Sequence, residues 1–206
     1  MVDNIGYHIR AWHVFSRAHG HEFTDEEIVG WTGATNAFYM ERMLGRPVPP
    51  DELKALEDAK EALYRKLYAP CLRLADGMRE ILDAAHQAGV VCAIASGAPT
   101  QNIDFVLDGL GIRDEFACVV DASQYAHGKP EPDCFLEAAR RVGAAPATCI
   151  VFEDAVNGVR AAHAAGMKAV ALAARTSRAV FEAVGADCIV DTFRGCLPEI
   201  RGLECR

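Results

Sequence analysis

Three short stretches of the sequence carry the side chains best suited to chemistry, and each comes shortly after an apolar run. They are Ser96-Gly97, Gly128–Asp133 and Glu153-Asp154. Short apolar runs suit strands buried in a parallel sheet, and open α/β sheets bind their ligands beyond the carboxyl ends of such strands. The sequence therefore predicts that a hydroxyl, a cation and two carboxylates meet at one edge of a sheet.

The first two stretches suit an anion with several oxygen atoms, such as phosphate. The hydroxyl of Ser96 and the backbone N–H groups around Gly97 can donate hydrogen bonds at the start of a helix. Lys129 adds a positive charge on a loop that Pro130 and Pro132 stiffen. The alternatives are a serine that only caps a helix and a lysine that only lies on a solvated turn.

The acidic couplet Glu153-Asp154 needs a balancing charge, because adjacent carboxylates at the end of a buried strand repel each other. Magnesium is the natural partner, since it takes oxygen ligands and is commonly held by one or two carboxylates together with water. We therefore expect Mg2+ as the cofactor, with Glu153 and Asp154 as ligands. The alternative is that Asp154 only caps a helix over Ala155–Ala165.

The first part of the chain, which leads up to these stretches, has a helical pattern only. Apolar residues repeat at helical spacing over Tyr7–Ala18, Thr35–Leu44 and Asp51–Leu67. Thr24–Glu27 has the form of a capping box, which marks a helix start. No convincing strand lies in this part, and we expect a small helical domain over residues 1–72.

From Ala75 onward, short apolar runs alternate with helical stretches. The expected strands are Val90–Ala95, Ala117–Asp121, Thr148–Phe152, Lys168–Leu172 and Asp187–Val190. The glycines expected at helix ends are Gly89, Gly143, Gly166 and Gly185. This alternation favours an α/β domain over residues 73–206, with an open, Rossmann-like parallel sheet and helices on both faces.

Composition places the chain among ordinary globular proteins. It has 206 residues, of which 51% are hydrophobic and 24% charged, and its net charge is −8. No run approaches the roughly 18 apolar residues of a membrane span, and the acidic balance argues against nucleic acid as a partner. The eight cysteines form no C-x-x-C pair, so we expect reduced thiols in a cytoplasmic protein. We expect a monomer or a weak dimer.

Taken together, these residues resemble the haloacid dehalogenase-like superfamily, which is dominated by magnesium-dependent phosphatases and phosphomutases. Ser96 looks like the second motif of that family, Lys129 like the third, and Val151–Asp154 with Gly158 like the fourth. The helical part matches the position of the family's cap domain. Tyr7–Trp12 is similar to the β-phosphoglucomutase-like branch. The resemblance covers essentially the whole chain.

The first motif of the family is missing from the chain. That motif is an apolar strand ending in Asp-x-Asp-Gly, and in this branch it runs directly into residues like Met1–Asn4. Residues 1–4 therefore look like a remnant of its loop, Asp3 is not the nucleophile, and the first, central strand of the core is absent. Three explanations are open: a start codon assigned too late, a truncated product without activity, or an inactive relative that kept the fold for binding. We favour the first.

With the missing segment restored, the resemblance implies phosphoryl transfer through an aspartyl-phosphate whose Asp lies upstream of this chain. Lys129 and Ser96 would then bind phosphoryl oxygens, and Mg2+ would neutralise charge between the nucleophile and the phosphate. The expected substrate is a small phosphorylated metabolite such as a sugar phosphate, and the expected activity is that of a phosphatase. The alternatives are a β-phosphoglucomutase-type sugar phosphomutase and an inactive binding or regulatory relative.

Substrate choice is expected to lie in the cap. The candidate contacts in its glycine-punctuated segment are Trp31, Thr32, Thr35 and Asn36. β-Phosphoglucomutases carry an arginine hereabouts for a second phosphate, whereas no basic residue lies between Trp31 and Met40 here, which favours a phosphatase. His8 is a further candidate, because it could order the site near the missing acid/base. The alternatives are that Trp31 and His8 only pack inside the cap.

Other enzyme classes lack their signatures in this sequence. Ile94–Ala98 does not contain the Gly-x-Ser-x-Gly turn of a serine hydrolase, and no Gly-x-Gly-x-x-Gly follows any expected strand. A haloacid dehalogenase proper needs no magnesium, so the couplet Glu153-Asp154 argues against that activity.

Overall fold

The chain folds into two compact units. The computed structural model describes residues 1–30 and 35–203. One unit, here called the helical unit, is Val2–Arg73; the other, here called the α/β unit, is Leu74–Arg206 together with Met1. The division lies one residue from the expected boundary between residues 72 and 73.

The helical unit contains helices at the positions that the apolar spacing predicts. Its elements are α1 (Ile5–Ala18), α2 (Asp25–Gly30), α3 (Asn36–Leu44), α4 (Pro50–Tyr68) and the 3-10 turn η1 (Ala69–Cys71). The capping box is confirmed, since the Thr24 N–H donates to Glu27 Oε2 at 2.8 Å and the Glu27 N–H donates to Thr24 Oγ1 at 3.2 Å. No strand occurs among the described residues of this unit.

Aromatic side chains form the core of the helical unit. Trp12 of α1 stacks on Tyr39 of α3, with ring centroids 4.3 Å apart and an angle of 13° between the planes. Phe15 and Phe23 meet the same indole edge to face. Because large rings bury much apolar area for each residue, a few helices are enough to give this small unit its own core.

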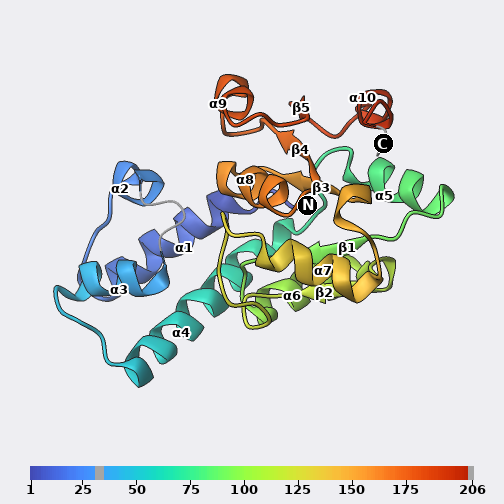
Figure 1. The fold of residues 1–206 in the computed structure, drawn as a ribbon. Coiled ribbons are helices and arrows are strands. Elements are labelled where there is room, and N and C mark those ends of the chain that lie inside the picture. The colour runs from blue at the N-terminus through green and yellow to red at the C-terminus, as the bar shows by residue number, and fades with distance from the viewer. Residues whose placement is uncertain (31–34, 204–206) are drawn as a thin grey trace. The chain divides into compact units, whose positions relative to one another are not determined.

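The α/β unit has the alternation of strands and helices that the sequence predicts (Figure 1). Its strands are β1 (Ala93–Ala95), β2 (Cys118–Val120), β3 (Ile150–Glu153), β4 (Lys168–Leu172) and β5 (Cys188–Val190). Its helices are α5 (Met78–Gln87), α6 (Thr100–Leu110), α7 (Asp133–Val142), α8 (Val156–Ala164), α9 (Arg178–Ala183) and α10 (Leu197–Arg201), with 3-10 turns η2 (Arg113–Glu115) and η3 (Pro146–Thr148). The four glycines expected at helix ends all have positive φ; Gly143, at 69°, closes α7.

The strands are all parallel but fall into two separate sheets. β1 pairs with β2, and β3, β4 and β5 pair in that order. Figure 1 shows the first pair in green and the three other strands in orange to red. Among the described residues, β1 and β3 are not paired with each other, so each presents one edge without a neighbouring strand.

The first strand of the α/β unit is shorter than predicted. The expected run Val90–Ala95 contributes only Ala93–Ala95 to the sheet, while Val90 and Val91 are 55% and 59% exposed. β1 has a single partner, β2, and its register with that strand begins at Ala93. The expected strand Lys168–Leu172, which pairs on both sides as β4, has the predicted bounds.

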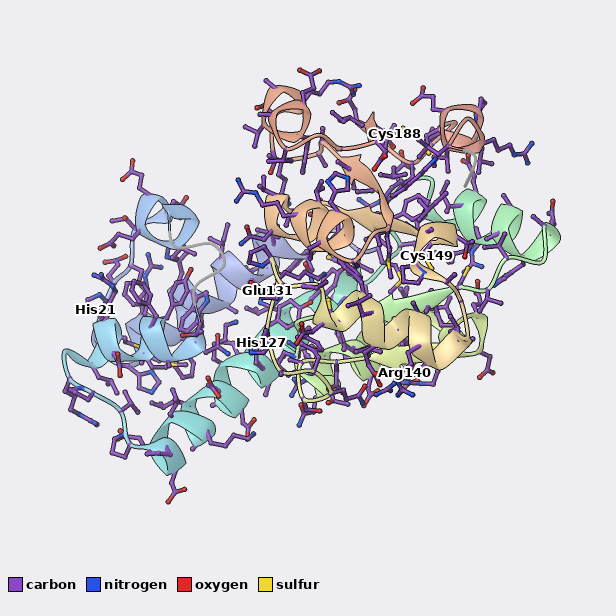
Figure 2. All side chains as sticks on the ribbon, in the orientation of Figure 1. His21, His127, Glu131, Arg140, Cys149 and Cys188 are labelled. Atoms are coloured by element: carbon purple, nitrogen blue, oxygen red, sulfur yellow. The ribbon has the colours of Figure 1, made fainter. Side chains whose placement is uncertain are left out.

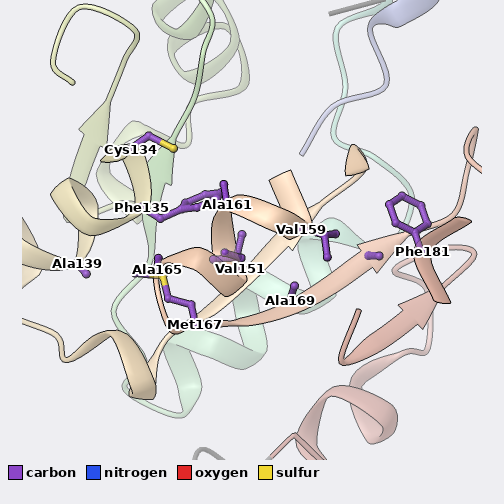
Figure 3. Close-up of a cluster of buried hydrophobic side chains, with 12 residues drawn as sticks. Cys134, Phe135, Ala139, Val151, Val159, Ala161, Ala165, Met167, Ala169 and Phe181 are labelled. Atoms are coloured by element: carbon purple, nitrogen blue, oxygen red, sulfur yellow. The ribbon is translucent and has the colours of Figure 1, made fainter. Parts of the chain in front are cut away.

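A cluster of small apolar residues holds α7 and α8 against the strands (Figure 3). Val151 of β3 and Ala169 of β4 pack with Val159 and Ala161 of α8, and Phe135 of α7 joins the same cluster. Alanine and valine keep the helix close to the sheet, and the close packing fixes where each helix begins. The loops before α7 and α8 are thereby positioned at the ends of β2 and β3.

The cysteines of the described residues are all free thiols, and Cys134 and Cys196 are buried. A buried thiol of this kind acts as a small apolar side chain. None of the helices in the described ranges has both the length and the hydropathy of a membrane span.

Candidate functional site

Ser96 directly follows β1 and is fixed by hydrogen bonds on both sides. Its N–H donates to the Val120 carbonyl at 2.9 Å, and its Oγ accepts from the Ala98 N–H at 3.1 Å. Helix α6 begins only at Thr100. Ser96 therefore closes a local turn and does not cap α6, which leaves its hydroxyl hydrogen available to an incoming anion.

Lys129 reaches from the loop before α7 to the end of β3. Its Nζ forms an ion pair with the carboxylate of Glu153 and lies 4.7 Å from the centroid of the Phe135 ring. The side chains of Lys129 and Glu153 are 21% and 10% exposed, so the alternative of a solvated lysine is wrong. His127 and Glu131 lie on the same loop (Figure 2). Two of the three predicted stretches are thus in direct contact.

Gly158 explains why Glu153 can take this position. A Cβ added at Gly158 would come within 2.1 Å of Glu153 Cδ, which is far shorter than a non-bonded contact, so the Glu153 side chain would have to move. The Glu153 side chain therefore lies against the first turn of α8, where the positive end of the helix dipole favours a carboxylate. One carboxylate joins the Lys129 loop, the end of β3 and the start of α8.

Asp154 is exposed, and it does not cap the helix that follows. The N-cap of α8 is Ala155 and makes no side-chain capping bond, so that alternative is wrong. The electrostatic neighbour of Asp154 is the α-amino group of Met1, whose pKa is lowered by burial and raised in part by Asp154 and Glu153. The Met1 carbonyl accepts from the Ala75 N–H at 2.9 Å. The main chain of Met1 is therefore held beside the acidic couplet.

Of the two acidic residues in the couplet, one offers its carboxylate as a ligand for magnesium. Within residues 1–30 and 35–203, no group of three or more His, Cys, Asp or Glu side chains could hold a metal ion. Lys129 balances Glu153, which leaves the Asp154 oxygens for a cation. Mg2+ is commonly held by one or two carboxylates, with water and substrate phosphate completing its shell. Asp154 fits this role, whereas Glu153 already has a cationic partner.

Asp121, which directly follows β2, is a further candidate site residue outside the three predicted stretches. It is 4% exposed and accepts from Thr100 Oγ1 at 2.7 Å and from the Ser123 N–H at 2.9 Å. Burial opposes its ionisation, yet the hydrogen bonds from Ser123 and Thr100 keep the Asp121 pKa below its usual value. The sequence did contain a signal for Asp121, because it is the acidic residue at the end of the apolar run 117–121.

Three candidate residues of the helical unit, His8, Thr35 and Asn36, have partners inside that unit. Thr35 caps α3 by accepting from the Phe38 N–H at 3.3 Å, and Asn36 Nδ2 donates to Glu61 Oε1 at 3.3 Å. His8 stacks on Tyr64, with ring centroids 3.7 Å apart. Burial and the neighbouring charge of Lys60 lower the His8 pKa to about 4. The candidates Trp31 and Thr32 lie outside the described residues.

A buried ion pair, Lys60 with Glu61, lies at the centre of these contacts. The two side chains meet at 2.8 Å and are 2% and 7% exposed, and Lys60 Nζ lies 3.3 Å from His8 Nδ1. The sequence carried a signal for it, because Lys60 falls on the apolar face that Leu53 and Leu56 define by helical spacing. The helical unit thus matches the Lys60 charge internally.

Comparison with known proteins now places this two-unit α/β protein in a family. The family model described as haloacid dehalogenase-like hydrolase matches residues 7–166. The chain belongs to the haloacid dehalogenase-like hydrolases. A Haemophilus influenzae protein described only as uncharacterized is 33% identical over 168 residues, which are 81% of this chain and 83% of that protein.

Two similar proteins of Escherichia coli carry the names of sugar phosphate phosphatases. Hexitol phosphatase B is 27% identical over 144 residues, which are 70% of this chain and 57% of that protein. Fructose-1-phosphate phosphatase YqaB is 46% identical over 78 residues, which are 38% of this chain and 42% of that protein. The chain thus matches less than two thirds of the length of either phosphatase.

Two solved structures have the same fold as this chain. CbbY from Rhodobacter sphaeroides superposes with a TM-score of 0.82 at 24% identity, covering 95% of this chain and 91% of that chain. β-Phosphoglucomutase from Clostridium difficile gives a TM-score of 0.83 at 22% identity, covering 98% and 91%. At these identities the likeness defines the fold, and the activity is a separate question.

Proposed function

We propose that this chain is the principal part of a Mg2+-dependent phosphatase that acts on a small phosphorylated metabolite such as a sugar phosphate. One observation carries the proposal: Lys129 bridges from its loop to Glu153, next to the exposed carboxylate of Asp154. A fixed cation and a metal-type ligand therefore lie at the end of the same strand. Membership of the family and the sugar phosphatases among its relatives support the same activity.

Each residue has a separate task in this proposal. The Ser96 hydroxyl, the Gly97 N–H and the Lys129 ammonium group bind the equatorial phosphoryl oxygens, and preorganised donors of this kind each contribute about 3 kcal/mol to transition-state stabilisation. Asp154 is the protein ligand of Mg2+. When bound, the metal supplies positive charge between the nucleophile and the phosphate.

The proposed nucleophile is an aspartate in a segment that precedes Met1 in a longer form of the protein. Its carboxylate oxygen attacks phosphorus, the ester P–O bond breaks, and the second aspartate of the Asp-x-Asp-Gly motif protonates the leaving alkoxide. Water then hydrolyses the aspartyl-phosphate. Two observations support an aspartate upstream of Met1 as the nucleophile. The Met1 main chain lies beside Glu153 and Asp154, and among the described residues β1 and β3 each have one edge that pairs with no strand.

The charge balance of the helical unit favours a monophosphate over a bisphosphate. Residues 31–40 contain no basic side chain, and the buried charge of Lys60 is matched by Glu61. A second phosphate would need an uncompensated cation, as a mutase intermediate requires. We therefore propose a substrate whose remaining part is neutral and rich in hydroxyl groups.

The test compares two forms of the protein in the hydrolysis of p-nitrophenyl phosphate with Mg2+. One form is the 206-residue chain, and the other is extended at its N-terminus by an apolar strand ending in Asp-x-Asp-Gly. We expect activity only in the extended form, and loss of that activity when the first Asp of the extension is replaced by Asn. Inactivity of both forms would favour a binding relative, and activity of the 206-residue chain would overturn the assigned roles.

A further inference from the structure

Tyr125 lies on the loop that carries Lys129 and contacts the turn that carries Ser96. It belongs to the loop between β2 and α7, four residues before Lys129, and its half-buried ring packs against the same cluster as Ala95. Its hydroxyl donates to the Ser96 carbonyl at 3.3 Å. A Cβ added at Gly97 would stand 3.6 Å from that hydroxyl, which is an ordinary contact. The phenol therefore borders the turn at Ser96-Gly97.

The hydrogen bond to Ser96 determines the direction of a neighbouring donor. The Ser96 carbonyl and the Gly97 N–H belong to one planar trans peptide group, in which C=O and N–H point in opposite directions. With the carbonyl held by Tyr125, the Gly97 N–H points away from the phenol. Within the described residues this N–H has no hydrogen-bond partner. Tyr125 thus fixes the orientation of a donor that is free to meet an anion.

The loop that carries Tyr125 is itself anchored at both ends. At its start, the Asp121 carboxylate holds Ser123 and, across to α6, Thr100. At its end, Lys129 pairs with Glu153. Burial and the nearby charge of Asp121 raise the Tyr125 pKa, so the phenol keeps its proton and remains a donor.

We propose that Tyr125 is a positioning residue for phosphate binding. By holding the Ser96-Gly97 peptide group, it sets the direction of the Gly97 N–H relative to Lys129, so that both donors can reach one phosphoryl group. The inference rests on the proposed function. It goes further by assigning a role to a residue outside the family motifs found in the sequence.

The test replaces only the hydroxyl, with Tyr125→Phe in the 206-residue chain. Inorganic phosphate is titrated in the presence of Mg2+, and the Gly97 N–H order parameter and the Ala98 amide exchange rate are measured by NMR. One hydrogen bond fixes the donor, so we expect phosphate affinity to fall about three- to tenfold. The Gly97 order parameter should fall and the Ala98 amide should exchange faster.

The matched control is Tyr39→Phe in the helical unit. Tyr39 also donates a phenol hydrogen to a backbone carbonyl, that of Ile28 at 3.1 Å, so the two variants lose the same chemical group. We expect Tyr39→Phe to leave phosphate affinity and the Gly97 and Ala98 signals unchanged. Equal effects of both variants would overturn the positioning role, because the change would then be a general loss of structure.

The remaining outcomes separate this inference from the proposed function. If the wild-type chain binds phosphate and Tyr125→Phe binds it equally well with an unchanged turn, the positioning role is overturned and the phosphatase proposal stands. If the wild-type chain binds no phosphate and the variant still loosens the turn, Tyr125 positions Gly97 but its role in phosphate binding is overturned, and the phosphatase proposal is decided by the extended form. If the wild-type chain binds no phosphate and the turn is unchanged in the variant, the positioning role is overturned altogether.

Discussion

The two units use the same kinds of charged side chains in opposite ways. In the helical unit, Lys60 and Glu61 meet inside the helix packing, where both are less than 8% exposed. In the α/β unit, Lys129 and Glu153 meet at a strand end, with side chains 21% and 10% exposed, so the two pairs differ at the lysine and not at the glutamate. The first pair is closed to solvent, whereas the second lies where an anion can reach it.

The different burial of the two lysines predicts different roles for the two ion pairs. An enclosed ion pair loses its hydration and must be satisfied internally, so removing one member leaves an uncompensated charge. A partly exposed pair keeps water nearby, so removing one member has a small effect on folding. Lys60 is therefore expected to matter mainly for the stability of its unit, and Lys129 mainly for ligand binding.

Replacing the buried lysine tests the comparison most severely. We expect Lys60→Met to lower the free energy of unfolding of the helical unit by about 3 to 5 kcal/mol, because Glu61 is left buried without its partner. Both tryptophans of the chain, Trp12 and Trp31, lie in this unit's sequence, so urea unfolding followed by their fluorescence reports on it. The double variant Lys60→Met/Glu61→Leu should recover most of the loss, and a single variant of wild-type stability would contradict the argument.

Matched glycine variants compare the backbones of the two units. Gly77 has φ of +81°, and a Cβ there would stand 2.0 Å from the Arg194 backbone nitrogen, so Gly77→Ala should cost about 3 kcal/mol from strain and overlap. Gly45 has φ of +65° with open space around it, so Gly45→Ala should cost about 1 kcal/mol. Urea unfolding measured by circular dichroism gives both values. Equal losses would show that the contact at Gly77 relaxes freely.

Acid should weaken the helical unit through His8. Burial lowers the folded-state His8 pKa from 6.5 to about 4, so the unfolded chain takes up a proton that the folded unit refuses. Stability is therefore full above pH 6.5 and falls as the pH drops toward 4, by an upper bound of roughly 3 kcal/mol. Lys60, Glu61 and Tyr64 surround the ring, and the Glu61 charge partly offsets the lowering of the His8 pKa.

The contribution of His8 is isolated by the difference between wild type and His8→Gln. The stability of each protein is measured at several pH values between 7 and 4 by tryptophan fluorescence in urea. We expect the variant to lose less stability on acidification than the wild type. Identical pH dependence of the two proteins would assign the effect to the carboxylates instead.

The smallest effect on folding is expected at Lys129. Lys129→Met should lower the free energy of unfolding by about 1 kcal/mol, because the lysine end of the pair is 21% exposed and water can reach the Glu153 carboxylate once the ammonium group is gone. The same change should weaken phosphate binding about tenfold or more, because a fixed cation is lost. Arg140→Met on α7 removes an exposed partner of Glu137 and should change neither quantity. A Lys129 variant as unstable as Lys60→Met would remove the distinction between the units.

The regular elements could be predicted where local pattern and tertiary contacts agree. Lys168–Leu172 was predicted with its observed bounds, because it is a continuous apolar run that pairs on both sides. Val90–Ala95 was predicted too long, since pairing with β2 begins only at Ala93. Spacing along the chain says that a residue can lie in a strand, but the number of partner strands decides how far the strand extends.

The places of the candidate residues along the fold could be predicted, whereas their contacts could not. Ser96 follows β1, Lys129 lies in the loop after β2, and Asp154 follows β3, but Glu153 is the last residue of β3 itself. The contact between Lys129 and Glu153 spans 24 residues, and no local pattern specifies it. Tyr125 carried no signal at all, because its role depends on a carbonyl that the fold brings to it.

The hydrogen bond from Ala75 to the Met1 carbonyl has a consequence for how this architecture can change. It holds together, within the α/β unit, the residues that flank the 72-residue segment Val2–Arg73. The segment is therefore a long insertion whose two ends are held close together. The entropic cost of closing such a loop rises only slowly with the length of the loop. Helices could be lengthened, shortened or exchanged there during divergence, and the proposed phosphate ligands would keep their framework.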